Sequence, residues 1–169
     1  QALIRDLQAY AQKCQRPAVV IGFEPQPNEY FQSALAPARL TRLREKCIEF
    51  NALGVQYFLC LRFCAALASW EAAEFIDKVL VQGLAIRHLV VGDDFRFGKN
   101  RRGDFALLQA AGAKHGFQVS RHETVGIQNQ RVCSSRVRGA LGLGNFALAE
   151  ELLGRPYAMT GRVVHGQKR

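Results

Sequence analysis

Apolar residues follow a helical period at the start of the chain and then change to short continuous runs. Residues 2–14 place apolar side chains three and four positions apart, which predicts an amphipathic helix. Pro17 ends this pattern. The apolar run AVVIGF at residues 18–23 then predicts a strand that is buried on both faces. The chain therefore begins an alternation of helices and strands.

The same alternation continues along most of the sequence. Further helices are predicted over residues 41–53, 69–80, 104–115 and 145–153, and further strands over residues 55–61, 88–91 and 117–120. Ser69 and Asn145 are the predicted N-caps of two of these helices. Strands separated by helices of this length predict an α/β fold with a doubly wound parallel sheet.

Length and composition predict one folded domain. The chain has 169 residues, of which 49% are hydrophobic and 22% charged, so it differs from the composition of disordered chains. It has no apolar run near the roughly 20 residues that cross a bilayer, and its start lacks the regions of a signal peptide. These features predict a cytoplasmic protein that does not bind membranes.

The formal net charge of +9 predicts partners that carry negative charge, such as nucleic acid, acidic lipid or phosphorylated small molecules. The basic residues gather near residues 99–102 and 131–138, with apolar segments between them. This distribution favours local anion sites over a continuous face for nucleic acid.

Cysteines and histidines give no sign of a metal site. Five cysteines without a CxxC pair predict free thiols buried in the apolar segments. Four histidines occur without HExxH or a similar ligand spacing. No metal cage of protein side chains is expected.

The segment VGDDFRFGKNRRGD at residues 91–104 directly follows a predicted strand. Ligands on parallel sheets bind beyond the carboxyl ends of the strands. Phe95 and Phe97 offer apolar surface to a planar ring, and Asp93 or Asp94 can accept hydrogen bonds from ring nitrogens. The alternative is that both phenyl rings anchor the loop to the core and the aspartates cap turns.

The segment RVCSSRVR at residues 131–138 leads into a predicted helix. Ser134 or Ser135 can be its N-cap, and the flanking Arg131 and Arg138 add positive charge to a helix N-terminus. This combination predicts a phosphate site without a Walker A sequence, which is absent from the chain. The alternative is an ordinary capped helix with solvated arginines.

Six motifs occur in order along the chain, and together they resemble the bacterial bifunctional riboflavin kinase/FAD synthetase family. They are FEPQP (23–27), ARLTRLREK (38–46), VGDDFRFG (91–98), the SSRVR helix start (134–138), ELLGRPY (151–157) and GRVVHG (161–166). The resemblance implies a Rossmann-like nucleotidylyltransferase domain at residues 1–155. It also implies the start of a riboflavin kinase barrel at residues 156–169. This C-terminal tail of the chain has a strand-like pattern.

This resemblance implies that Mg²⁺-ATP and FMN are the substrates, and that FAD and pyrophosphate are the products. The family roles fall on Arg131, Ser134, Ser135 and Arg138 for ATP, with Ser134 and Arg138 at the reacting phosphate. They fall on Phe23, Pro25, Pro27, Asp94 and Phe95 for the flavin. Mg²⁺ is expected on substrate oxygens, and neither nucleic acid nor a membrane is an expected partner.

Two features of the family pattern are missing from these residues. Its first strand and H-x-G-H turn do not occur, so the sheet is expected to contain a gap, and these residues alone are expected to make little FAD. Cys133 also stands where the family has the first serine of I-S-S-T. Two alternatives stay open: another nucleotidylyltransferase of this fold, and a basic domain that binds nucleic acid without catalysis.

Overall fold

The computed structural model describes residues 2–163 and 166, and these form two compact units. The first unit comprises residues 2–37 and 50–124, and the second comprises residues 38–49 and 125–163. Helix α3 (Leu43–Ala52) contributes residues to both units.

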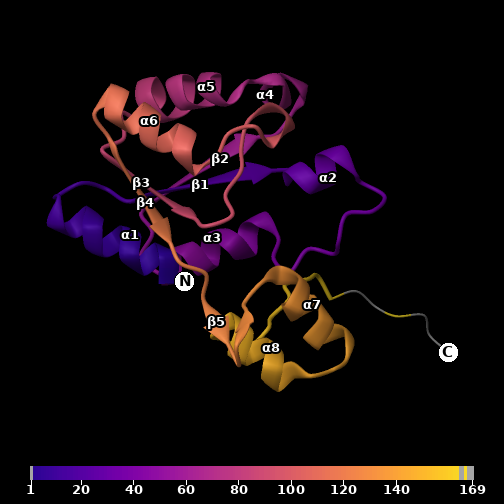
Figure 1. Cartoon of the computed structure of the whole chain (residues 1–169). Helices are drawn as coiled ribbons and strands as arrows, with labels where there is room; N and C mark the ends of the chain where they lie inside the picture. Colours follow the sequence, from indigo (N-terminus) through magenta and orange to yellow (C-terminus); the bar gives the residue numbers. More distant parts are fainter. Residues whose placement is uncertain (1, 164–165, 167–169) are drawn as a thin grey trace. The chain divides into compact units, whose positions relative to one another are not determined.

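The first unit alternates strands with helices, as the sequence predicts. Its four strands are β1 (Val19–Glu24), β2 (Tyr57–Arg62), β3 (His88–Gly92) and β4 (Gln118–His122). Its helices are α1 (Ala2–Lys13), α2 (Pro27–Phe31), α4 (Ala65–Ser69), α5 (Ala72–Phe75), the π-helix η1 (Ile76–Gly83), the 3₁₀ turn η2 (Lys99–Arg101) and α6 (Phe105–His115). Helices α5 and α6 lie on one face of the strands and α1 on the other (Figure 1).

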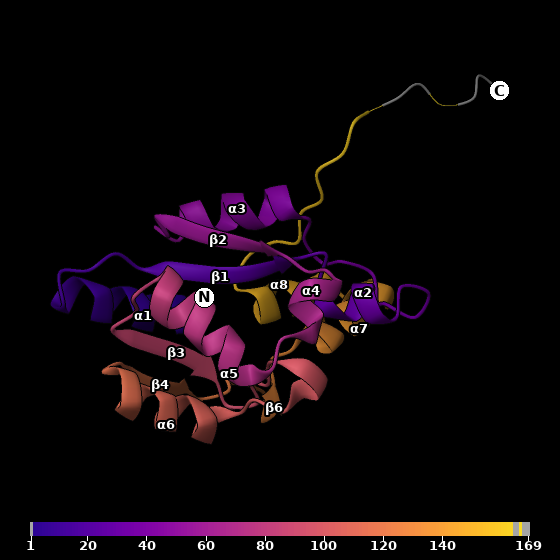
Figure 2. The same ribbon diagram turned by 90° about the horizontal axis from the view of Figure 1, so that it is seen from above.

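The strands form two parallel pairs rather than one continuous sheet. β1 pairs with β2 from Val19 opposite Tyr57, and β3 pairs with β4 from His88 opposite Gln118. β1 and β3 lie side by side with their arrows in the same direction (Figure 2), and no hydrogen-bonded ladder joins them among the described residues. The α/β class with parallel strands is confirmed, and so is the expected gap in the sheet.

An apolar cavity of about 510 Å³ occupies that gap. Its walls come from β1, β3, α1 and the helices of the opposite face, and they include Leu7, Ile21, Leu80 and Val90. We refer to this cavity as the β1–β3 groove. Beside it the core gathers around α5, η1 and α6, with the buried residues Ala72, Phe75, Ile76, Val79, Leu80, Val91, Phe97, Leu108 and Phe117.

Local signals explain where several of these elements begin. The Asp104 carboxylate accepts a hydrogen bond from the Leu107 amide at 2.9 Å and caps α6, at the first residue of the predicted helix. The prediction for Ser69 is wrong, because that residue ends α4 and its hydroxyl donates to the Ala66 carbonyl oxygen. Glu71 caps α5 instead, in a capping box.

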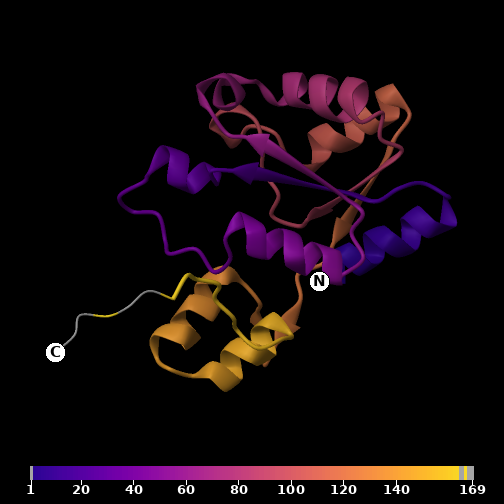
Figure 3. The ribbon, with the colours of Figure 1, turned by 180° about the vertical axis from the view of Figure 1, so that it is seen from behind.

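The second unit contains a small antiparallel hairpin and two helices. The hairpin strands are β5 (Gly126–Ile127) and β6 (Gln130–Arg131). The helices α7 (Ser134–Gly142) and α8 (Phe146–Leu153) pack together and appear in orange and yellow in Figure 3. Their contact buries Val137, Ala140, Ala149 and Leu152.

Asn145 caps α8, as predicted, since its side-chain oxygen accepts from the Leu148 amide at 3.0 Å. The helical pattern that begins at Ser134 is interrupted before that cap, where Gly144 has a φ of +69°. The strand-like pattern of the tail does not form a strand at residues 157–163. Residues 164, 165 and 167–169 of the expected barrel start lie outside the described residues.

Candidate functional site

Four aromatic side chains gather at the carboxyl ends of β1 and β2. Phe23 lies in β1, and Phe63 follows β2, where its amide donates to the Glu24 carbonyl oxygen at 3.0 Å. The rings of Phe23 and Phe63 meet edge to face with centroids 5.8 Å apart. Tyr30 and Phe31 of α2 pack on the Phe63 ring at 5.3 and 5.7 Å. We name these four residues the aromatic ledge.

The aromatic ledge presents apolar surface to solvent. Phe31 is 64% exposed, although phenylalanine side chains usually lie inside a protein, and Tyr30 is 40% exposed. Aromatic rings that stay accessible beyond the ends of parallel strands are suited to a planar ligand. Of these residues, Phe23 was predicted from the sequence, whereas Tyr30 and Phe31 were not.

The two prolines of FEPQP direct the chain onto this ledge. The Glu24–Pro25 peptide bond is cis, and Pro27 occupies the first turn of α2. Gln26 begins the helix, with its amide donating to the Glu29 carboxylate at 3.0 Å. The predicted residues Phe23, Pro25 and Pro27 therefore lie together, beside side chains that the prediction did not include.

Some side chains of the loop after β3 are buried in the core and others are exposed. Phe97 is only 8% exposed and lies between Phe95, at a centroid distance of 5.5 Å, and Phe75, at 5.7 Å. The expectation that Phe97 offers a ligand platform is therefore wrong, and its alternative as a core anchor is correct. Phe95 is half-buried and Asp94 is exposed, so both remain accessible candidates.

Glycine and hydrogen bonds fix the shape of that loop. Gly98 has a φ of +72°, and a side chain there would lie 2.7 Å from the backbone of Ala72. Phe97 and Gly103 exchange two backbone hydrogen bonds, at 3.2 and 2.9 Å. The Asp93 carboxylate accepts from the Thr124 hydroxyl, which ties the loop to the residues after β4.

The start of α7 carries the two serines predicted for phosphate binding. Cys133 is the N-cap, and its side chain makes no capping hydrogen bond. The expectation that Ser134 or Ser135 is the N-cap is wrong, because both residues are in the first turn of the helix. Both are exposed. The first turn thus offers two hydroxyls and the positive end of the helix dipole to an anion.

The arginines near α7 have different roles. The Arg136 guanidinium donates to the carbonyl oxygens of Ile127 at 2.9 Å and Gln130 at 3.2 Å, so it supports the β5–β6 hairpin. Arg138, one turn along α7, donates from Nε to the Ala38 carbonyl oxygen at 2.6 Å. Arg131 is exposed in β6.

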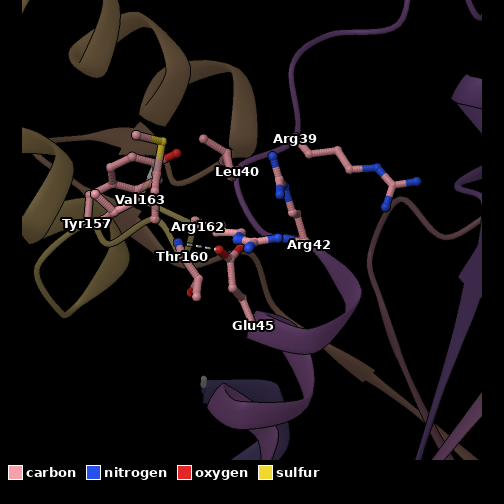
Figure 4. Close-up of a pocket in the computed structure, with 10 residues that line it drawn as sticks. Arg39, Leu40, Arg42, Glu45, Tyr157, Thr160, Arg162 and Val163 are labelled. Atoms are coloured by element: carbon pink, nitrogen blue, oxygen red, sulfur yellow. Dashed lines mark hydrogen bonds between the residues drawn. The ribbon is translucent and has the colours of Figure 1, made fainter. Parts of the chain in front are cut away.

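The segment that Arg138 contacts lines an open cavity of about 760 Å³ (Figure 4). Arg39, Arg42 and Arg162 contribute positive charge to it. The amides of Arg42 and Thr160 donate to the Glu45 carboxylate at 2.7 and 2.8 Å. These two hydrogen bonds, with the Arg42 bond the stronger influence, hold the pKa of Glu45 below its usual value.

The described residues also bear on the expectations about metal ligands, thiols and membrane spans. No group of three or more metal-ligating His, Cys, Asp or Glu side chains occurs among the described residues. All five cysteines are free as predicted, but four are exposed and Cys64 is half-buried, so their predicted burial is wrong. Across residues 2–163, every helix is too short or too polar to cross a membrane.

Comparison with known proteins identifies relatives for nearly the whole chain. The model of the FAD synthetase family matches residues 1–136. The bifunctional riboflavin kinase/FMN adenylyltransferase of Escherichia coli K12 is 49% identical over 168 residues, and that of Pseudomonas fluorescens is 48% identical. Each match covers 99% of this chain and 54% of the relative, so the chain spans about half the length of these relatives.

A solved structure gives a similar fold. The crystal structure titled as a macrolide-efflux protein from Streptococcus pneumoniae superposes with a TM-score of 0.77 at 28% identity. The match covers 98% of this chain and 55% of that one.

Proposed function

Because the chain belongs to the FAD synthetase family, we propose that it supplies the site at which FMN is adenylylated by ATP. In this reaction a phosphate oxygen of FMN attacks the α-phosphorus of ATP, the bond from that phosphorus to the bridging oxygen breaks, and pyrophosphate leaves. The products are FAD and pyrophosphate. The observation that carries the proposal is the family match over residues 1–136, which includes the aromatic ledge and the first turn of α7.

The ATP phosphates are assigned to the start of α7. Ser134 and Ser135 offer hydroxyl and first-turn backbone groups, and Arg131 and Arg138 offer positive charge. Arg138 is held by its bond to Ala38, so its side chain is positioned before a ligand arrives. Ser134 and Arg138 are the proposed contacts of the transferred phosphoryl group, where they would stabilise the developing charge.

The isoalloxazine ring is assigned to the side of the aromatic ledge. Phe23, Pro25 and Pro27 supply the rigid turn, and the exposed ring of Phe31 supplies contact area. Asp94 and Phe95 of the loop after β3 complete the proposed flavin residues, with the carboxylate accepting from ring N–H groups. Tyr30 and Phe63 support Phe31 through their edge-on contacts.

Magnesium enters this proposal as part of Mg²⁺-ATP. The ion prefers several oxygen ligands and commonly takes them from substrate phosphates and water. The donor set of the described residues fits that arrangement, because the proposed ATP contacts are hydroxyls, amides and guanidiniums rather than clustered carboxylates. The ion would neutralise phosphate charge, while Ser134, Ser135 and Arg138 orient the same group.

The relatives are also named as riboflavin kinases, and we assign that second activity to a longer polypeptide than these 169 residues. We propose residues 1–155 as the adenylyltransferase domain and residues 156–169 as the start of a riboflavin kinase domain that makes FMN from riboflavin. The names and lengths of the relatives support this division. Kinase activity is not proposed for these 169 residues.

Binding and turnover test the proposal separately. Calorimetry with Mg²⁺-ATP and quenching of flavin fluorescence with FMN measure the two sites in the 169-residue chain. Chromatography detects FAD formed by this chain and by a longer version that supplies the H-x-G-H turn. Binding of both ligands, with FAD formed chiefly by the longer version, supports the proposal.

Other substrates discriminate the alternatives. Nicotinamide mononucleotide and a phosphopantetheine test for a different nucleotidylyltransferase of the same fold. Single-stranded RNA tests for a nucleic-acid-binding domain. Adenylylation of either other acceptor in preference to FMN would overturn the assignment of substrate, and tight RNA binding without nucleotide binding would overturn the assignment of function.

A further inference from the structure

One side chain of α7 holds the β5–β6 hairpin to the start of that helix. Nη1 of Arg136 donates to the Ile127 carbonyl oxygen at 2.9 Å and to the Gln130 carbonyl oxygen at 3.2 Å. Ile127 and Gln130 are opposite each other in the antiparallel ladder, one in each strand. The half-buried guanidinium therefore joins both strands of the hairpin to the first turn of α7.

The turn that this guanidinium spans has a backbone conformation that its residues do not favour. Gln128 and Asn129 have φ values of 56° and 58°, in a region that residues other than glycine adopt less readily. The Gln128 side-chain oxygen accepts from Nη2 of Arg136 at 3.4 Å, and its amide group donates to the Glu151 carboxylate of α8 at 3.1 Å. Polar contacts thus run from α7 through the turn to α8 and hold the turn in this shape.

The closed loop contains three of the four residues proposed for the ATP phosphates. Arg131 is the second residue of β6, and Ser134 and Ser135 are the first two residues of α7. Only two residues connect Arg131 to Ser134, so the direction of the Arg131 side chain depends on how the hairpin meets the helix. The bridge made by Arg136 fixes that junction, because it bonds to the residue directly before Arg131.

We propose that Arg136 is a positioning residue, which holds the hairpin so that Arg131 faces the phosphates of bound ATP. Arg136 does not contact the phosphates itself, because both of its terminal nitrogens are bonded to acceptors of the hairpin. A hairpin that is ordered before ATP arrives lowers the entropy cost of placing Arg131 on the ligand. The inference rests on the proposed function, since it requires that ATP binds at the start of α7.

The chemical difference between arginine and lysine separates this role from a simple contribution of charge. A guanidinium is planar and presents several donors in a fixed arrangement, whereas the ammonium of lysine is a compact charge on a flexible chain. Arg136→Lys therefore keeps the positive charge beside the helix start but cannot reproduce the bridge to Ile127, Gln130 and Gln128 together. If only charge matters, the lysine variant keeps its affinity for ATP.

A double-mutant cycle tests whether Arg136 acts through Arg131. Calorimetry gives the Kd for Mg²⁺-ATP of the unaltered chain, Arg131→Ala, Arg136→Ala and the double variant. We expect each single substitution to raise the Kd by about 5- to 20-fold, and the double variant to exceed the weaker-binding single variant by no more than about 2-fold. Arg87→Ala, which removes an exposed arginine beside the β1–β3 groove, is the matched control and should change the Kd by less than about 2-fold.

Two further measurements test the mechanism. Without ATP, amide hydrogen exchange over residues 125–132 should be about 5- to 10-fold faster in Arg136→Ala than in the unaltered chain. Arg136→Lys should lose at least about 3-fold in affinity for ATP. The Kd for FMN should stay within about 2-fold in every variant, which shows that the fold is kept. If Arg136→Ala does not fold, Arg136→Lys and Gln128→Ala, which removes the contact at the turn alone, supply the same comparisons.

The outcomes separate this inference from the proposed function. Losses that add in the double variant would show that Arg136 does not act through Arg131. Unchanged exchange over residues 125–132 would show that the bridge does not order the hairpin, and unchanged ATP affinity in Arg136→Lys would show that charge suffices. Each of these results overturns the inference while ATP binding by the unaltered chain stands. If the unaltered chain does not bind Mg²⁺-ATP, the proposed function is wrong and the inference is wrong with it.

Discussion

Replacing Arg138 with alanine should separate ATP binding from flavin binding. The side chain lies one turn into α7, and its Nε already donates to the Ala38 carbonyl oxygen at 2.6 Å. The substitution therefore removes a proposed phosphate contact and an observed hydrogen bond. These two losses have different readouts.

The magnitudes follow from the two interactions. A hydrogen bond between a guanidinium and a phosphate contributes about 1.5 to 3 kcal/mol, so the Kd for Mg²⁺-ATP should rise about 10- to 100-fold. The bond to Ala38 is between a charged donor and a carbonyl at an exposed position, so its loss should lower the free energy of unfolding by only about 1 kcal/mol. A chain that remains folded should keep its affinity for FMN.

Calorimetry with ATP, fluorescence titration with FMN and denaturant unfolding measure these three quantities on the same preparation. Lys78→Ala is the matched control, because it removes the same charge from an exposed side chain that pairs with Glu74 at 3.0 Å. This control should change the Kd for ATP less than about 2-fold. If Arg138→Ala leaves ATP binding intact, the assignment of Arg138 is wrong. Equal losses of ATP and FMN affinity would show that the substitution acts through folding.

Three further predictions concern the proposed flavin site, one glycine and one histidine. Phe31→Ala should weaken FMN binding about 3- to 10-fold by fluorescence titration, whereas Phe146→Ala, which removes an equally exposed ring, should not; equal effects would refute the ledge. Gly98→Ala should lower the free energy of unfolding by about 1 to 3 kcal/mol, because φ at this position is +72° and the new Cβ would meet the Ala72 backbone. Gly139→Ala, on α7 with open space around it, should instead raise the free energy of unfolding by about 0.5 to 1 kcal/mol. Burial lowers the pKa of His88 below 6.5, so the unfolded chain takes up this proton first as the pH falls. Unfolding curves should therefore show stability that is present above pH 6.5 and declines below it, and His88→Gln should reduce this decline; an unchanged pH profile would contradict the argument.

Periodicity predicted the helices and strands wherever a segment was long enough to repeat. The helix at α1 and the strand at β1 were both predicted within one residue of their observed ends. The β5–β6 hairpin was not predicted, because each strand has only two residues and no alternation can develop. Its turn residues, Gln128 and Asn129, both have positive φ but lack the Asn-Gly signal of such turns.

The aromatic ledge shows why the proposed flavin site was only partly predictable from the sequence. FEPQP lies within five consecutive residues, so its rigid turn was visible in the sequence. Phe31 and Phe63 come from segments joined only through the parallel pairing of β1 with β2, and that register is a tertiary property. The predicted burial of the cysteines was wrong for a related reason. An apolar pattern identifies a segment that packs against the protein, but the exposure of each side chain depends on which other residues cover it.

Arg136 and Arg138 show why the sequence alone does not predict which arginine of a basic motif can bind phosphate. The two residues are two positions apart in one motif, and both have the residue type expected at a phosphate site. In α7 they point about 200° apart around the helix axis, because each residue advances by about 100°. Arg136 consequently reaches carbonyl oxygens of the hairpin at 2.9 and 3.2 Å, whereas Arg138 reaches the chain at Ala38. A guanidinium engaged by two carbonyl groups would have to leave them to meet a phosphate. Arg138, whose bond to Ala38 uses Nε alone, is therefore the arginine that we propose for the phosphate.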